Sequence, residues 1–397
     1  MGHDLVLTGR SAGLVTSLLV PLACGGSGPR SMSAPSQLHA CANPSLVLAG
    51  RFHSDGGVDL VVPCLFDGTL AMLAGNGDGT FQPPERTPLP GGTAVSAVAA
   101  DFDADDNLDL ALTGFLDGGV AVLRGNGDGT FRPPMFLSAG LPPALIPGSL
   151  VAASLFDGRS EDLAALLGGS STPSGAVAVF QSLGNGLFSP ALVTPPITAF
   201  LTGLAAGAIT LDGGTDLLVA TVAVEPMDAG TGVQIFRAGA DAGLALAAVA
   251  TFPLGGTLET ADLNGDGALD ILGVDNSSLL GVALGNGDGT FRPAQTFATQ
   301  GLPVDLAVAD FNGDGIPDVA VANWLGVPGG LCHTSGAGSI GIFLGNGDGT
   351  FQPVQLFPAG NGAFTLTVAD FNGDGRPDVA SLDSQSGAID VILNRWR

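Results

Sequence analysis

The sequence predicts an all-β fold, a seven-bladed β-propeller of four-stranded antiparallel blades, and three observations support this prediction. An acidic pattern, written DFNGDGxPD in its complete form, returns seven times and always ends in an aspartate. A glycine-rich turn, GNGDGTF, follows it in phase, and short apolar runs flank both. Repeats of about 50 residues with strand-like content cannot bury a core alone, so they stack or close into a ring. The seven terminal aspartates, 48 to 60 residues apart, are Asp59, Asp109, Asp162, Asp216, Asp270, Asp318 and Asp378.

One blade can be assembled from residues 304–359. The run VDLAVA, which ends at Ala309, predicts the first strand because it holds small and β-branched residues. The acidic loop spans residues 310–318, VAVAN predicts the second strand, and SIGIFLG predicts the third. Asn-Gly and Asp-Gly favour a hairpin turn, so GNGDGTF leads to a fourth strand around FQPVQLF. The proline in this last segment predicts a position at the sheet edge.

The two ends of the chain predict how the ring closes. The seventh repeat ends in AIDVILNRWR, after a third strand and without a fourth. Upstream of the first repeat, SAPSQLH at residues 33–39 resembles the fourth-strand segment QPVQLF. We therefore expect residues 32–39 to form the outer strand of the last blade, within a propeller that spans residues 32–397.

The combined pattern resembles the FG-GAP/VCBS repeat family, whose best-known fold relative is the integrin alpha-subunit propeller. The resemblance covers nearly the whole chain after residue 31. It implies a seven-bladed propeller with calcium in the loop between the first and second strands of a blade. It implies less about function, because the fold serves adhesion proteins, lectin-like proteins and some enzymes.

The residues themselves also predict calcium in four loops. In residues 310–318, oxygen-bearing side chains occupy the first, third, fifth and ninth positions, and the seventh residue can offer a carbonyl oxygen. Such hard ligands in an irregular shell suit calcium better than magnesium or zinc. A metal-free polar turn is the alternative, but neighbouring carboxylates would then repel by ~1 kcal/mol per pair in water. The expected ligands are Asp101, Asp103, Asp105 and Asp109; Asp262, Asn264, Asp266 and Asp270; Asp310, Asn312, Asp314 and Asp318; and Asp370, Asn372, Asp374 and Asp378.

The other three loops have lost most of these ligands, and we expect them to hold no calcium. In blade one Arg51 replaces the first ligand, where its guanidinium could stand near the remaining carboxylates. Blade three keeps only Asp162 of the four side-chain ligands, and blade four keeps Asp212 and Asp216.

The charge of the chain excludes two classes of partner. The formal net charge is −25, from 37 acidic and 12 basic residues. Nucleic-acid binding requires a basic surface, and attachment to an anionic membrane by charge requires basic segments. We expect neither partner.

The first 24 residues predict an export signal. The apolar run SAGLVTSLLVPLA is too short to span a bilayer and has the form of a signal-peptide core. Ala23–Cys24, followed by a flexible linker at residues 25–31, resembles a bacterial lipoprotein cleavage site, although Pro21 and Asp4 depart from that pattern. An ordinary secretory signal and a disordered leader are the alternatives. We expect a secreted, periplasmic or cell-surface protein without a transmembrane segment, and lipid attachment at Cys24 stays open.

Two of the four cysteines are expected to lie close together. Cys41 precedes the first strand of blade one and Cys64 ends its second strand, so both fall on the face away from the acidic loops. A disulfide and two buried free thiols both fit this placement, and Cys332 would remain unpaired.

The sequence favours a binding module over an enzyme. It contains no GxSxG, Walker or HExxH motif, and its four histidines form no recognisable catalytic set. We therefore expect a non-catalytic protein-binding or adhesion module; the alternatives are a lectin-like carbohydrate binder and an enzyme of the polysaccharide lyase or hydrolase type.

The expected partner, a protein or glycan, should bind on the face opposite the calcium loops. Long connections of variable length lie there, and such loops commonly carry recognition. The candidate residues are Trp324 and His333 in blade six, and Glu225 and Asp228 in blade four. Packing of Trp324 against its own loop is the alternative for that side chain.

Overall fold

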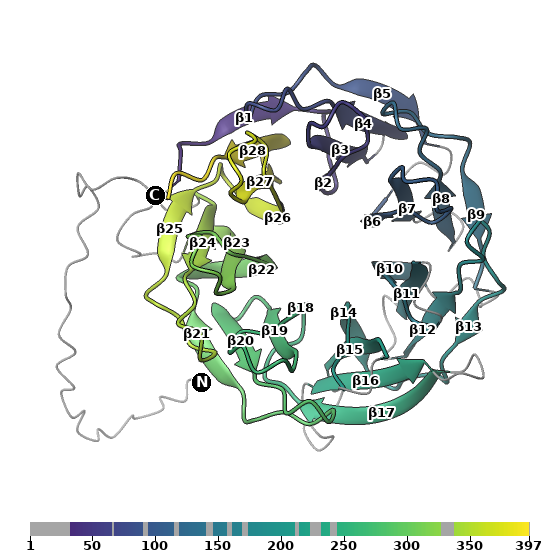
Figure 1. The fold of residues 1–397 in the computed structure, drawn as a ribbon, viewed down its shortest axis with the longest axis vertical. Coiled ribbons are helices and arrows are strands. Elements are labelled where there is room, and N and C mark those ends of the chain that lie inside the picture. The colour runs from purple at the N-terminus through teal and green to yellow at the C-terminus, as the bar shows by residue number, and fades with distance from the viewer. Residues whose placement is uncertain are drawn as a thin grey trace, which may run out of the picture.

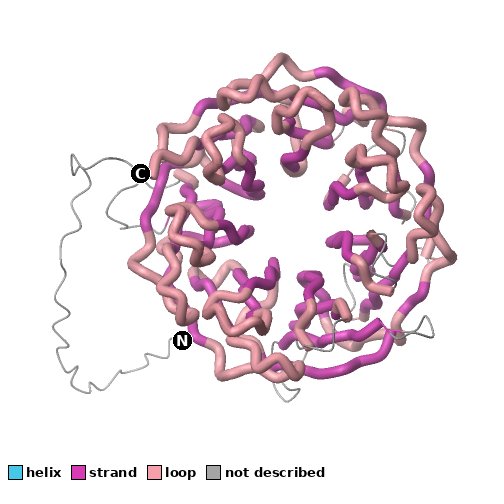
Figure 2. The backbone as a smooth tube through the Cα atoms, in the orientation of Figure 1, coloured by secondary structure: helices cyan, strands magenta, loops and turns pink. Residues whose placement is uncertain are grey.

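The fold is a closed ring of seven four-stranded antiparallel sheets (Figure 1). The computed structural model describes residues 32–65, 67–89, 94–114, 119–139, 146–156, 161–168, 174–210, 214–222, 232–238, 244–326 and 337–396. Figure 2 shows strands and connecting loops alternating around the whole ring. Within these ranges, no helix has the length and apolarity needed to cross a bilayer.

Each blade consists of four antiparallel strands that lie side by side in order from the axis of the ring to its rim. The innermost strands are β2 (Leu48–Gly50), β6 (Ser96–Ala100), β10 (Ile146–Ala153), β14 (Phe200–Gly207), β18 (Thr257–Ala261), β22 (Gly301–Ala309) and β26 (Ala363–Ala369). The second strands are β3 (Asp59–Cys64), β7 (Asp109–Thr113), β11 (Asp162–Gly168), β15 (Asp216–Val222), β19 (Asp270–Val274), β23 (Asp318–Gly326) and β27 (Asp378–Asp383). The third strands are β4 (Thr69–Leu73), β8 (Val120–Leu123), β12 (Gly175–Phe180), β16 (Gly232–Ala238), β20 (Leu279–Ala283), β24 (Ser339–Phe343) and β28 (Ala388–Ile392). The outer strands are β5 (Glu85–Pro88), β9 (Met135–Leu137), β13 (Leu192–Val193), β17 (Leu244–Thr251), β21 (Gln295–Ala298), β25 (Gln355–Pro358) and β1 (Ser36–His39).

The outer strand of blade seven comes from the N-terminal part of the chain, which confirms the predicted closure. Strand β1 pairs antiparallel with β28, with Ser36 opposite Val391 and His39 opposite Ala388. The pairing extends to a bridge between Met32 and Asn394. Because the first and last strands share one sheet, the ring has no open blade edge at this junction.

The hydrophobic core lies between neighbouring blades, and the two repeated motifs build part of it. The second residue of each acidic loop is apolar and buried; the seven are Phe52, Phe102, Leu155, Ile209, Leu263, Phe311 and Phe371. In blade seven the Phe371 ring meets the Phe81 ring of the blade-one turn edge to face, with centroids 5.7 Å apart. The Gly79 N–H of that turn also donates to the Phe371 carbonyl, at 2.9 Å. The two motifs therefore join blade seven to blade one as well as shaping their own loops.

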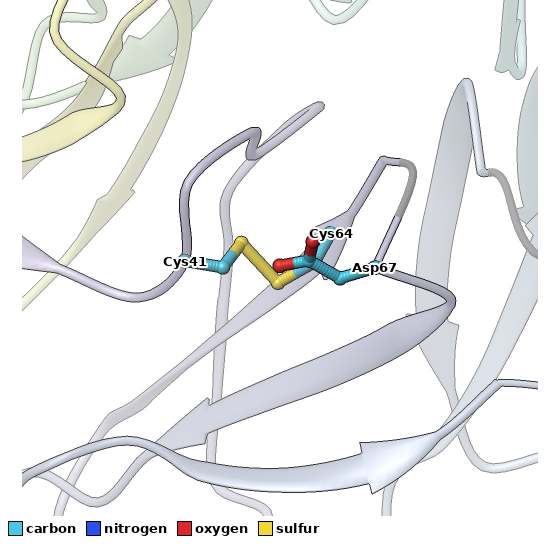
Figure 3. Close-up of side chains that lie close together, drawn as sticks. All are labelled: Cys41, Cys64 and Asp67. Carbon is cyan, nitrogen blue, oxygen red and sulfur yellow. A yellow bond between two sulfur atoms is a disulfide. The ribbon is translucent and has the colours of Figure 1, made fainter.

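The disulfide predicted as one of two alternatives is present. Cys41 and Cys64 are bonded, with their Cα atoms 6.1 Å apart. Figure 3 shows the Asp67 carboxylate beside the bridge. Since both sulfurs are in the bridge, neither is a thiolate that could bind a metal ion with Asp67.

Candidate calcium loops and ligand-binding face

The ninth aspartate of each complete loop is buried and accepts backbone hydrogen bonds both from its own loop and from the segment that follows the third strand of its blade, an arrangement we call the bracket. In blade six Asp318 is fully buried. Its Oδ2 accepts a hydrogen bond from Phe311 N at 2.9 Å, and its Oδ1 accepts one from Gly345 N at 2.7 Å. The same pair of bonds is made by Asp109, Asp270 and Asp378. These four residues were expected as calcium ligands, and the structure shows a second role that needs no ion.

The bracket also occurs in blades without a complete acidic loop. Asp59 in blade one accepts from Phe52 N at 2.9 Å and from Gly75 N at 3.0 Å. Asp162 in blade three accepts from Leu155 N at 2.9 Å and from Ser182 N at 2.8 Å. A buried backbone N–H without an acceptor is costly, so blades one and three also have a reason to keep this aspartate.

Two of the blades with incomplete loops place a basic side chain on the ninth aspartate. In blade four the Arg237 Nε lies 3.2 Å from Asp216 Oδ1. In blade one His53, at the third loop position, brings its Nδ1 to 3.0 Å from Asp59 Oδ2. The sequence allowed Arg51 to stand near these carboxylates; among the described residues, the basic side chain on Asp59 is His53. Asp212 of blade four lies outside the described residues.

The loops of blades five, six and seven close around their first aspartate. In blade six Asp310 Oδ1 accepts from Gly313 N at 2.7 Å, and Oδ2 accepts from Gly315 N at 2.8 Å. Both glycines have positive φ, 77° and 81°, which the tight turn requires. Asn312 donates from Nδ2 to Asp314 Oδ2 at 2.9 Å. A carboxylate has about four lone-pair directions, so acceptance from loop amides leaves room for a cation.

Blade two brings three of its expected ligands together. Carboxylate oxygens of Asp101, Asp103 and Asp109 lie within 4.8 Å of one another. Asp103 Oδ1 is buried and has no hydrogen-bond partner among the described residues. Asp105 instead accepts from Asn107 N at 3.0 Å and is not part of this trio. Three converging hard oxygens, one of them buried and unpaired, fit a calcium ion.

The electrostatics of blade two also favour a cation. Burial and the Asp105 charge raise the pKa of Asp103, and burial raises the pKa of Asp109 to about 6. Arg132 supplies some positive charge, with Nη1 3.7 Å from Asp103 Oδ2 and Nη2 3.5 Å from Asp105 Oδ2. Both aspartates are thus poorly solvated as anions, and a bound cation would stabilise their charged forms.

In blades five to seven the ninth aspartates are likewise poorly solvated as anions. Burial raises the pKa of Asp270 and of Asp318, and it raises the pKa of Asp378 to about 6. The first and fifth carboxylates of these loops bind the loop's own amides. Among the described residues, the carboxylates of Asp101, Asp103 and Asp109 in blade two are the group of three acidic side chains that converges within 4.8 Å.

The opposite face carries the tryptophan that sequence reasoning selected. Trp324 lies near the end of β23 and is 39% exposed. Its Nε1 donates to Ser384 Oγ of blade seven at 3.1 Å, so the side chain bridges to the next blade. Phe364, at the start of β26 on the same face, is 45% exposed. The other three predicted partner residues, His333, Glu225 and Asp228, lie outside the described residues, as do Cys24 and Cys332.

Two acidic residues in the central channel were not selected from the sequence. The innermost strands surround a channel of about 590 Å³ that Glu259 and Asp305 line. Asp305 Oδ2 accepts from Leu366 N at 2.9 Å. Burial raises the pKa of Asp305 to about 7, and burial with the neighbouring Asp305 charge raises that of Glu259 to about 7. The available signal was a single acidic residue inside each inner-strand run, VDLAVA and TLETA, whose other residues are uncharged.

Comparison with known families identifies the repeats. An FG-GAP-like repeat model matches residues 52–112, 262–321 and 331–381, and an FG-GAP repeat model matches residues 303–343. The chain carries FG-GAP repeats. No curated protein sequence is detectably similar to this FG-GAP propeller.

Two solved structures share the fold of the FG-GAP propeller. One is an Agrocybe aegerita lectin described as specifically recognising non-reducing terminal N-acetylglucosamine, with a TM-score of 0.52, 20% identity, and coverage of 89% of this chain and 86% of the lectin. The other is BBS1N in a complex with ARL6DN, with a TM-score of 0.59, 12% identity, and coverage of 92% and 97%. At these identities the similarity supports the fold alone.

Proposed function

We propose that this FG-GAP propeller is an exported, calcium-stabilised, non-catalytic recognition module that binds a protein or glycan on the face opposite its acidic loops. The observation that carries this proposal is a pair of exposed aromatic side chains on that face, Trp324 of blade six and Phe364 of blade seven. Exposed aromatic side chains are common anchors of binding interfaces. A closed ring holds them rigidly, so little ordering is needed on binding.

Calcium has a structural role in this proposal. Asp101, Asp103 and Asp109 would hold one ion in blade two, and the corresponding positions of blades five to seven would hold three more. The convergence of the blade-two carboxylates and the unpaired Asp103 Oδ1 support the assignment. Bound calcium would compensate the carboxylate charges on one face and leave the other face to the partner.

Export is supported by the disulfide as well as by the N-terminal sequence. Disulfides persist in oxidising compartments outside the cytosol. The Cys41–Cys64 bridge belongs to the propeller itself, beside the strand that closes the ring. A secreted, periplasmic or cell-surface location accounts for both features.

The two similar structures come from recognition proteins of different kinds. One title describes sugar recognition by a lectin, and the other describes a complex between two proteins. They support recognition as the use of the fold without deciding between a glycan and a protein for this chain.

A binding screen with the purified chain in 1 mM calcium tests the proposal. A glycan array and a protein capture experiment, followed by reconstitution with each purified candidate partner, cover both ligand classes. Trp324→Ala should weaken binding at least tenfold, ~1.4 kcal/mol or more. Phe136→Ala is the matched control, because Phe136 is also exposed, at 57%, but lies on the outer strand of blade two. If no ligand of either class binds, or if only Phe136→Ala weakens binding, the proposal is wrong.

A further inference from the structure

A pocket of about 330 Å³ lies on this same face, between blades seven and one. Blade seven contributes Phe364 and the turn at residues 384–386, and the N-terminal segment contributes residues 43–45. Leu65, just after β3, completes the wall on the blade-one side. The volume is at the lower end of the range for small-ligand sites, which is about 300–1,000 Å³.

Both walls of the pocket are fixed by interactions within the protein. On one side the disulfide follows directly after β1, and Leu65 N donates to the Asn43 carbonyl at 2.7 Å. On the other side the buried Asp383 carboxylate accepts from Gln385 N at 3.0 Å and from Ser386 N at 3.2 Å. Ser384 is held by the Trp324 indole N–H. The pocket is therefore preformed, which lowers the entropic cost of binding.

The chemistry of the pocket is neutral in a strongly acidic protein. None of the residues that line it is charged, although the chain has a net charge of −25. The side-chain amides of Asn43 and Gln385 are exposed and offer both donors and acceptors. The Phe364 ring supplies an apolar wall. An anionic ligand would be repelled by the field of the whole protein, and a cationic one would find no carboxylate in the lining.

We propose that this pocket binds a neutral, terminal monosaccharide of a glycan. The apolar face of the sugar ring would pack on Phe364, and its hydroxyl groups would bond to the amides of Asn43 and Gln385. One ring of this kind matches the pocket in size, in polarity and in its need for both donors and acceptors. This inference rests on the proposed function and names the ligand class for its face.

The test begins with a glycan array probed with the wild-type chain in 1 mM calcium. The monosaccharide that ends the strongest ligands is then titrated calorimetrically into wild type and variants. Phe364→Ala should lower the affinity at least tenfold, and Asn43→Ala and Gln385→Ala should each lower it severalfold. Phe136→Ala should leave it unchanged. The melting temperature of each variant shows whether it is folded; if Phe364→Ala is not, the Asn43→Ala/Gln385→Ala double variant decides.

Several results would overturn the inference. The inference is wrong if the array shows no binding to neutral terminal sugars or if acidic glycans alone bind. It is also wrong if the affinity is unchanged in the Phe364 and amide variants. If a purified protein partner still binds in a manner that depends on Trp324, the proposed function stands and only the sugar pocket is wrong. If neither a glycan nor a protein binds, both proposals are wrong.

Discussion

Blades five to seven and blades one, three and four use the same loop in different ways. Both groups keep a buried ninth aspartate on backbone amides, as Asp318 and Asp59 illustrate. Only the first group keeps acidic residues at both the first and fifth positions, as in Asp310 and Asp314. The repeated motif thus combines two features in one stretch of sequence: a buried aspartate that accepts backbone hydrogen bonds, and the acidic positions that we propose bind calcium in the complete loops.

The incomplete blades also show what can stand near the bracket when no ion is expected. His53 and Arg237 bring a basic group from the protein itself to the bracket carboxylate. Blade two has features of both groups, because it keeps the full acidic set and also has Arg124 and Arg132 near Asp103. The following predictions test this division, beginning with the largest expected effect.

Removing a bracket aspartate should be the most destabilising of these changes. Asp59→Ala leaves two buried N–H groups unpaired, at ~1–3 kcal/mol each, so the free energy of unfolding should fall by ~2–6 kcal/mol. Asp318→Ala should cost a similar amount. Asp310→Ala, measured in chelator, should cost much less, because Asp310 binds exposed loop amides. Urea unfolding gives all three values, and equal losses for Asp310 and Asp59 would remove the distinction between bracket and ion loop.

Calcium should stabilise the protein through the complete loops alone. Extracellular calcium modules often have Kd values of ~0.1–1 mM, so each site contributes ~0.4–1.4 kcal/mol at 1 mM calcium and four sites contribute ~2–6 kcal/mol. Chelation should lower Tm, and calcium should restore it better than magnesium. Elemental analysis should find about four calcium ions per chain.

A pair of matched variants assigns the calcium effect to particular loops. Asp310→Ala should remove one ion and part of the calcium-dependent rise in Tm. Asp55→Ala, at the fifth position of the incomplete blade-one loop, should leave both unchanged. A wild-type Tm that does not respond to chelator, together with no calcium by elemental analysis, would refute the assignment.

Proton binding should compete with calcium at the complete loops. The pKa of Asp109 and of Asp378 is about 6 in the folded protein and 3.8 in the reference state. The folded state therefore binds more protons between these values, and without calcium its stability should fall as pH rises from about 4 to about 6. The size is on the order of 3 kcal/mol per carboxylate.

Calcium should offset this loss, so its stabilising effect should be larger at pH 7 than at pH 4.5. Urea unfolding at both pH values, with calcium and with chelator, measures the difference. Glu259 and Asp305 add a dependence of the same sign that does not involve calcium, and an Asp305→Asn background reduces it. A chelated protein that is more stable at pH 7 would contradict the prediction.

The smallest effect concerns the backbone of blade two. Ala104 and Asp106 have φ of 59° and 66°, where the loops of blades five to seven have glycine. Replacing either with glycine relieves ~1–2 kcal/mol of strain and loses ~0.5–1 kcal/mol to unfolded-chain entropy, so a gain of ~0.5 kcal/mol is expected. Gly313→Ala in blade six is the reverse test: its φ is 77° and a Cβ there would meet nothing within 4 Å. It should destabilise by ~1 kcal/mol; stabilisation by this change would contradict the account.

The features that sequence reasoning predicted are those set by local pattern or by repetition. The blades, the hairpins and the closing strand at residues 36–39 follow from motifs that recur in phase. The bracket could not be predicted, because the partners of Asp318 are backbone amides of residues 311 and 345, which any sequence supplies. The contact of Trp324 with Ser384 joins two blades across 60 residues and depends on how the blades pack.

Ring closure by β1 has a mechanical consequence for any load applied through the N-terminal end. The start of β1 pairs with the end of β28, and a bridge joins Met32 to Asn394, so tension on that end would break the Met32 bridge first and then the Ser36–His39 pairing one residue at a time. Cys41 lies two residues beyond His39 and is covalently attached to blade one. Detachment would stop there, with blade seven reduced to three strands and blade one still covalently attached to the load-bearing chain. The N-terminal segment thus combines a strand pairing that can break and re-form with a covalent disulfide that holds under the same load.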